Sequence, residues 1–244
     1  MQIQNSKQTI WSLKDTIKVL LGFFGINAIL FALWNLHVKY GVFNFFITTN
    51  QILNGVLLYI LSVVTFLIPL YFFVIRRKKA KLSDFGIVKI TLWQGVRTVL
   101  LGYGILILLT SIIALITLYF GDIPGIGPQR SVLPIFGEGT FAVTIAAIIA
   151  IGIAPTVEEI FFRGFLLNSF MSEFSFFTAT IITSAIFAFV HFQFESILGI
   201  FILSLIINYL YKVSGKSTSA TIIFHMVNNT VAIAVLLNLD KITK

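Results

Sequence analysis

The sequence predicts an all-helical, polytopic membrane protein, and its composition and hydropathy pattern carry that prediction. Hydrophobic residues make up 58% of the 244 residues, and charged residues make up only 11%. The mean hydropathy is strongly positive, and a soluble globule of this length would leave too much apolar surface in contact with water. The apolar residues also fall in long runs, which suit helices that cross a bilayer. We therefore expect a single membrane domain over residues 1–244, with about seven transmembrane helices (six to eight).

Seven apolar runs give this count, and polar or turn-forming segments separate them. The expected spans cover residues 17–36, 52–75, 92–120, 140–170, 175–192, 196–211 and 218–239. Pro69 and Pro155 fall inside the second and fourth runs and predict bends there, which neighbouring helices can accommodate. The apolar stretch 41–49 is too short to cross, so we expect an interfacial or re-entrant segment.

Basic residues predict how the bundle is oriented. The block Arg76-Arg77-Lys78-Lys79 follows the second span, and Lys and Arg are retained on the cytoplasmic side of a membrane. With this block inside, eleven of the seventeen Lys and Arg lie in cytoplasmic segments and four lie outside. The protein is thus expected in the cell membrane with its amino terminus in the cytoplasm. Membrane topology also accounts for the net charge of +8, and a nucleic-acid partner is not expected.

Three ionisable residues inside the fourth span are the strongest functional signal. A carboxylate at membrane depth costs about 3 kcal/mol or more, so Glu158 and Glu159 are expected to serve a function. Glu159 and Arg163 are four residues apart and share a helix face, whereas Glu158 is rotated by about 100° from Glu159. We expect Glu159 and Arg163 to form an internal structural pair that leaves Glu158 available for chemistry. The alternative is one structural cluster of all three, which would bury a net negative charge.

The fifth and seventh spans add polar residues at a similar depth. His191 closes the fifth span, and His225 and Asn229 share one face of the seventh. At 1.5 Å per residue, Glu158, His191 and Asn229 lie about 18, 24 and 16 Å from the cytoplasmic helix ends, and His225 lies about 10 Å from its own. A site in the cytoplasmic half of the bilayer is therefore expected. Water attack needs a base, an orienting group and oxyanion donors, which these residue types supply; packing and interhelical hydrogen bonding are the alternative.

A bound metal is a rival use of the same side chains. Glu158, His191 and His225 match the ligand types of a catalytic zinc ion. The zinc-protease helix motif, in which two histidines four residues apart flank a glutamate, is absent from the sequence. The chain also has no cysteine, which excludes thiolate ligands, disulfides and a cysteine nucleophile. The sequence leaves open whether zinc takes part.

The polar residues of these three spans resemble the motifs of the CAAX-protease and bacteriocin-processing (CPBP/ABI) family of intramembrane endopeptidases. The matching residues are Glu158-Glu159 with Arg163-Gly164, Phe187 with His191, and His225 with Asn229. The resemblance covers residues 140–239, which we take as the protease core, while residues 1–139 match only as peripheral hydrophobic helices. It implies a helical core that cleaves peptide bonds, in which Glu158 and His191 activate water and His225 and Asn229 form the oxyanion site. The family has been described both as metal-dependent and as glutamate-type.

The predicted function is therefore an intramembrane endopeptidase that hydrolyses a peptide bond of a membrane-associated peptide or protein precursor. Family members process prenylated proteins, bacteriocin leaders or signalling peptides, and nothing in the sequence selects among them. The content of Phe, Ile and Lys is typical of a bacterial protein, which favours a peptide precursor over a lipidated carboxyl-terminal motif. A non-catalytic immunity or scaffold protein is one alternative. A proton-coupled transporter is the other, although the chain shows no internal repeat and its immersed ionisable residues lie in one half.

Overall fold

The computed structural model describes residues 9–41 and 50–242. All regular structure in this part of the chain is helical, which confirms the predicted fold class. Six helical segments are long and apolar enough to cross a membrane, and a seventh apolar helix, Phe176–Phe189, is shorter. The interfacial segment expected at residues 41–49 lies, beyond its first residue, outside the described residues.

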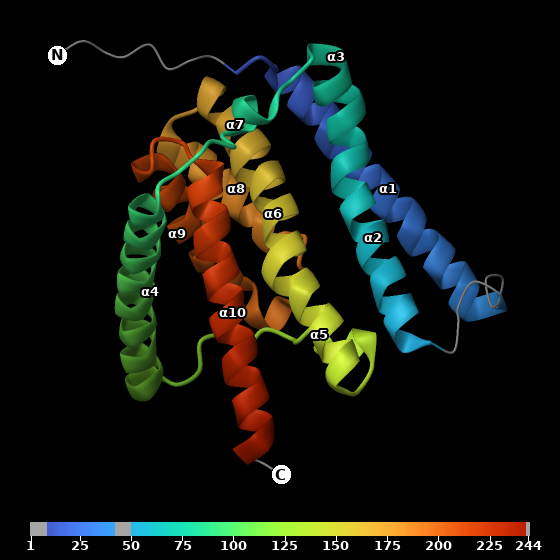
Figure 1. Cartoon of the computed structure of the whole chain (residues 1–244), viewed down its shortest axis with the longest axis vertical. Helices are drawn as coiled ribbons and strands as arrows, with labels where there is room; N and C mark the ends of the chain where they lie inside the picture. The colour runs from blue at the N-terminus through green and yellow to red at the C-terminus, as the bar shows by residue number, and fades with distance from the viewer. Residues whose placement is uncertain (1–8, 42–49, 243–244) are drawn as a thin grey trace.

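The helices form one bundle in which chain-distant segments pack together (Figure 1). The α-helices are α1 (Leu13–Tyr40), α2 (Gln51–Leu70), α3 (Arg76–Lys78), α4 (Leu92–Phe120), α5 (Thr140–Ile148), α6 (Ala154–Glu159), α7 (Asn168–Glu173), α8 (Phe176–Phe189), α9 (Ile197–Val213) and α10 (Thr218–Ile242). Short π segments are η1 (Tyr71–Ile75), η4 (Ile149–Ile153) and η5 (Ile160–Leu167), and short 3-10 turns are η2 (Leu82–Phe85), η3 (Leu133–Phe136) and η6 (Phe194–Ser196).

The fourth predicted span is a continuous helical run from α5 to α7 that is interrupted twice by π geometry. Pro155 explains the first interruption, because proline has no N–H and its ring clashes with the carbonyl four residues earlier. The segment η4 ends just before it, and a π turn of this kind is a common cause of helix bending. The second π segment, η5, begins directly after Glu159. π segments occur often at functional sites.

Contacts between distant residues define the end of the bundle that carries α3. The Asp15 carboxylate caps the first turn of α1 through Ser12 and lies 3.0 Å from Lys78 Nζ in α3. At the start of α10, the Thr218 N–H donates to the carbonyl oxygen of Gly86 at 2.9 Å. The starts of α1 and α10 therefore lie near α3, whereas the loop 121–139 joins α4 to α5 at the other end (Figure 1). We call these the α3 end and the loop end.

Candidate active site

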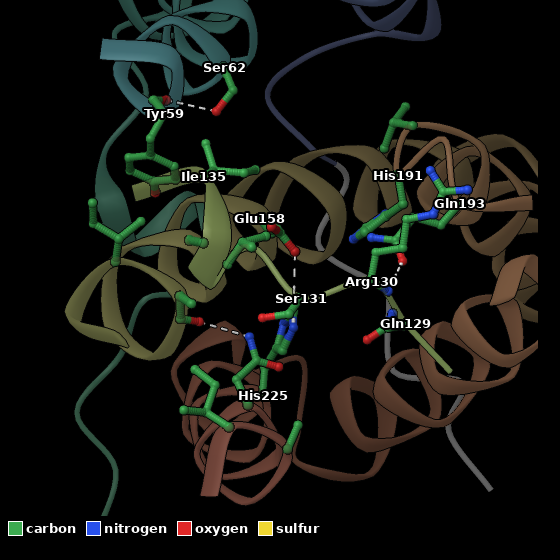
Figure 2. A pocket seen from close by; sticks show the side chains of 18 of the residues that line it. Tyr59, Ser62, Gln129, Arg130, Ser131, Ile135, Glu158, His191, Gln193 and His225 are labelled. Atoms are coloured by element: carbon green, nitrogen blue, oxygen red, sulfur yellow. Dashed lines mark hydrogen bonds and ion pairs between the residues drawn. The ribbon is translucent and has the colours of Figure 1, made fainter. Parts of the chain in front are cut away.

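A cavity of about 770 Å³ lies between α2, α6, the end of α8 and α10. All four residues predicted to be catalytic line it: Glu158, His191, His225 and Asn229. They come from three helical segments far apart in the chain. In Figure 2 the carboxyl group of Glu158 and the rings of His191 and His225 point into the same space. The structure thus brings together the residues that the sequence suggested only by residue type and approximate depth.

The two adjacent glutamates occupy different environments. The side chain of Glu158 is 22% exposed and faces the cavity, whereas that of Glu159 is completely buried. Both stand at the end of α6, and the helical rotation between consecutive residues turns them to different surfaces. Glu158 is therefore the carboxylate of the pair that lines the cavity.

Arg163 is the partner of Glu159, as the helical spacing predicted. Its Nη1 donates to Glu159 Oε1 at 2.9 Å, and both side chains are fully buried. Its Nε donates to Asn208 Oδ1 at 3.0 Å, and its Nη2 donates to Ser204 Oγ at 2.8 Å. The guanidinium group also lies 4.8 Å from the ring centre of Phe187. Hydrogen bonds on several sides are what a buried ion pair needs to offset the loss of hydration.

His225 is held by Glu159 and directed toward Glu158. Its Nδ1 lies 2.8 Å from Glu159 Oε1. Because a carboxylate that is paired with arginine only accepts hydrogen bonds, Nδ1 carries the hydrogen and donates. The other ring nitrogen, Nε2, lies 4.0 Å from Glu158 Oε2. Glu159 thus has a second contact that the sequence did not predict: it fixes the ring that faces the cavity.

His191 stands just beyond α8, which ends at Phe189 rather than at the predicted residue 192. Beyond the end of α8, Phe192 adopts a left-handed backbone conformation (φ 50°), so the chain does not continue as a helix there. The His191 Nδ1 lies 2.6 Å from the carbonyl oxygen of Phe187, and its ring packs on the Phe187 ring. Since a carbonyl can only accept, Nδ1 donates and Nε2 keeps a lone pair. The ring contact gives the phenylalanine four residues before His191 a role in positioning the imidazole.

Asn229 docks on a carbonyl that Pro155 leaves without a backbone donor. In the π register the Ala154 N–H donates to the carbonyl of Ile149. The next residue, Pro155, has no N–H to offer to the carbonyl of Ala150. Asn229 Nδ2 supplies that donor at 2.8 Å. The proline in the fourth span therefore positions a polar residue of the seventh, and the second N–H of the same amide nitrogen is left for other partners.

Glu158, His191 and His225 offer one carboxylate and two imidazoles, which are ligand types that zinc accepts. Among the described residues, no group of three or more His, Cys, Asp and Glu side chains is arranged to hold one. In this structure Glu158, His191 and His225 are therefore not gathered into a three-ligand group. Both histidines use Nδ1, on the carbonyl oxygen of Phe187 and on Glu159, and this leaves Nε2 of each ring for contacts in the cavity.

The cavity has polar residues that the sequence did not single out. The Arg130 N–H donates to Gln193 Oε1 at 2.8 Å, and the Arg130 side chain pairs with Glu195. Arg130 and Gln193 line the cavity, as does Tyr59 of α2, whose hydroxyl is buried without a hydrogen-bond partner in the described parts of the chain. Residues 130 and 193 share no sequence pattern. Only the fold brings them together.

The sequence of this region agrees with a known family. Residues 140–231 match the family model described as Rce1-like, type II CAAX prenyl endopeptidase Rce1-like. These residues form a Rce1-like domain. The resemblance to the CAAX proteases is thereby confirmed, and the Rce1-like domain contains every residue of the predicted motifs. No curated protein and no solved structure matches the chain.

The family is named for endopeptidases, a class of enzymes that act on peptides or proteins. Two parts of the cavity wall lie outside the Rce1-like domain in the chain. Tyr59 belongs to α2, and Arg130 belongs to the loop before α5. The residues before the domain therefore contribute to the cavity, in addition to forming apolar helices.

Proposed function

We propose that this protein is an intramembrane endopeptidase that hydrolyses a peptide bond of a membrane-associated peptide or protein precursor, using water activated by Glu158. The observation that carries the proposal is that Glu158, His191, His225 and Asn229 line one cavity. Most of the remaining wall is apolar, which suits a peptide segment that enters from the bilayer.

The first step is the attack of water on the scissile carbonyl carbon. His191 Nε2 is free to accept a hydrogen bond from that water, because Nδ1 is engaged by the Phe187 carbonyl oxygen. Glu158 takes the proton as the carbon–oxygen bond forms. The carbonyl oxygen becomes an oxyanion, which would accept hydrogen bonds from the second N–H of Asn229 and from a protonated His225 Nε2.

The second step breaks the carbon–nitrogen bond. Glu158 returns the proton to the leaving amine, and the products are a carboxylic acid and an amine. Glu159 takes no proton in this scheme, because Arg163 and His225 engage it. Its role is to hold the His225 ring and to balance the charge of Arg163.

The central experiment replaces Glu158 with Gln and compares the peptides released by cells that express either chain. We expect at least one released peptide to disappear, because a neutral amide cannot take the proton from water. The matched control is Glu138→Gln, which changes an exposed glutamate in the loop 121–139 that does not line the cavity. An unchanged peptide profile with Glu158→Gln would support the alternative, a non-catalytic immunity or scaffold protein.

The donor geometry also motivates a test of metal dependence. Since Glu158, His191 and His225 are not grouped as ligands, our mechanism routes no step through a metal ion. We expect purified protein to keep its activity after exhaustive chelation, with less than one metal ion bound per chain by elemental analysis. Activity that is lost on chelation and restored by zinc would contradict this.

We further propose that the protein lies in the cell membrane with its amino terminus and α3 in the cytoplasm. The charge distribution supports this orientation, because Lys and Arg are retained on that side. The α3 end carries ten of the described Lys and Arg: Lys14, Lys18, Arg76, Arg77, Lys78, Lys79, Lys81, Lys89, Lys212 and Lys216. The loop end has three, namely Lys39, Arg130 and Lys241.

A further inference from the structure

The cavity is closed toward the α3 end of the bundle. Between Glu158 and that end lies a layer of side chains with almost no exposed surface: Phe161, Phe162, Phe165, Leu166, Phe187 and Arg163. Beyond this layer, Trp11 stacks on Phe85 with ring centres 5.1 Å apart, and both are buried. Close-packed aromatic side chains leave no room for water or a peptide. Within residues 9–41 and 50–242, the α3 end therefore offers no route to Glu158.

The cavity reaches the surface at the loop end. Its lining continues from Glu158 to Gln129, Arg130, Ser131 and Gln193, which we call the mouth. The Arg130 side chain is 69% exposed. Figure 2 shows these mouth residues near Glu158 and His191. A polar and partly exposed rim is compatible with water, unlike the apolar side chains of α2 and α10 that line other parts of the cavity.

The mouth is part of the folded structure, because hydrogen bonds join its two chain segments, the loop before α5 and the segment between α8 and α9. The Gly127 N–H donates to the carbonyl oxygen of Glu195 at 2.6 Å, and the Leu198 N–H at the start of α9 donates to that of Gly125 at 2.9 Å. A side chain at Gly127 would lie 2.7 Å from the Glu195 carbonyl oxygen, so only glycine permits this approach. The loop is thereby fixed beside the end of α8 and the start of α9.

From these observations we propose that the cavity takes its substrate from the non-cytoplasmic face of the membrane. The closed α3 end carries most of the basic residues and the open mouth lies at the opposite end, so the positive-inside rule directs the mouth outward. The substrate class, which rests on the proposed peptidase function, is then a peptide precursor that presents its cleavage site on that face. Its apolar segment would lie against Leu58, Phe66, Ile233 and Leu236 of α2 and α10, with its polar end at the mouth.

The absence of cysteine from the chain makes this proposal directly testable. Single cysteines are introduced by Gln129→Cys at the mouth, by Ala154→Cys in the cavity wall one turn before Glu158, and by Ser83→Cys at the exposed α3 end. Each full-length variant is labelled with a membrane-impermeant charged maleimide in right-side-out and in inverted membrane vesicles. Ser62→Cys, also in the cavity wall, is a second interior position should Ala154→Cys fail to reach the membrane.

We expect Gln129→Cys and Ala154→Cys to react in right-side-out vesicles, and Ser83→Cys to react only in inverted or detergent-opened ones. Reaction of the cavity cysteine from the same side as Ser83→Cys would overturn the access route. The proposed access route would also be overturned if the cavity cysteine reacted from neither side. The same holds if the mouth cysteine, Gln129→Cys, reacted only in inverted vesicles. The labelling requires no catalysis. An inactive protein would leave this pattern intact, so failure of the peptidase proposal is distinguishable from failure of this one.

Discussion

Glu158 and Glu159 are neighbours in the sequence, but their contacts assign them opposite tasks. Glu159 is enclosed by Arg163 and His225, with no exposed surface. Glu158 has part of its surface in the cavity, and its Oε2 lies 4.0 Å from Nε2 of His225. A buried ion pair is sensitive to the loss of one partner because the other charge is left uncompensated. The two glutamates should therefore respond differently to the same substitution.

Glu159→Gln should destabilise the protein, whereas Glu158→Gln should abolish cleavage with little change in stability. The first leaves the Arg163 guanidinium buried without its counterion, at a cost of about 3–5 kcal/mol. The second removes a carboxylate that makes no buried ion pair with Arg163. Thermal unfolding of both variants in detergent measures the difference. Equal melting temperatures would mean that Glu159 does not stabilise the fold through Arg163.

Asn229 should affect the rate of the chemical step more than the affinity for substrate. If its second N–H stabilises the oxyanion, Asn229→Ala is expected to lower kcat about 100-fold, as for the loss of other oxyanion donors. Steady-state kinetics would show KM nearly unchanged. Asn238→Ala is the matched control, because that side chain is exposed on the same helix and donates only to the Ala234 carbonyl oxygen. A change in KM alone would assign Asn229 to binding.

For individual residues, the sequence was informative about residue type and helix face, because helical spacing fixes which side chains share a surface. It correctly separated Glu158 from the Glu159–Arg163 pair. The contact between Asn229 and Ala150 could not be predicted, since it depends on which carbonyl a π turn leaves free. The contact between His225 and Glu159 depends on how α10 packs against α6.

Among the helical segments, η5 contains the motif residues Arg163 and Gly164. It follows Glu159, contains Arg163, and packs against the short turn η2. Gly164 is the point of closest approach, because a side chain there would lie 2.6 Å from the backbone oxygen of Phe85. The Arg163-Gly164 pair of the sequence motif thus combines a buried charge with a position that cannot hold a side chain. The same backbone oxygen accepts from the Thr218 hydroxyl.

Gly164→Ala is therefore expected to destabilise the protein by about 1–3 kcal/mol, the usual cost of forcing extra atoms into a packed region. Gly104→Ala is the control, since an added side chain at that helical glycine of α4 meets nothing within 4 Å. It should be neutral or stabilise the protein by up to about 1 kcal/mol. Melting temperatures of both variants in detergent provide the test. A Gly164→Ala variant as stable as the native chain would show that η2 moves aside at little cost.

The bounds of a helix were predicted well where hydropathy alone determines where the helix begins and ends. The third span, expected at residues 92–120, is found as α4 (Leu92–Phe120). Hydropathy could not reveal that the fourth span contains π turns, because an extra residue in a turn leaves the apolar pattern almost unchanged. It also placed the end of the fifth span too late, because apolar residues continue beyond the end of α8 at Val190 and Phe192.

For the whole molecule, the charge asymmetry and the position of the cavity mouth together support the proposed direction from which substrate enters. The sequence predicted the asymmetry, because basic residues cluster between particular spans. It also placed the site in the cytoplasmic half, from the depths of single residues. In the structure the cavity that those residues line opens toward the loop end, which depth estimates could not reveal. The closure on the α3 side comes from side chains of α8, η5 and the segment before α1, which meet only in the folded bundle.

The cavity wall formed by α10 offers a test of whether the substrate occupies this space. Ala232 lines the cavity, whereas Ala234, two residues later on the same helix, does not. Ala232→Phe should fill part of the cavity and lower kcat/KM about tenfold or more, which corresponds to about 1.4 kcal/mol of lost transition-state binding. Ala234→Phe adds the same ring to an exposed surface and should leave cleavage unchanged. Because both variants carry the same added volume and hydrophobicity on one helix, equal activity in the two would mean that the substrate reaches Glu158 by another path.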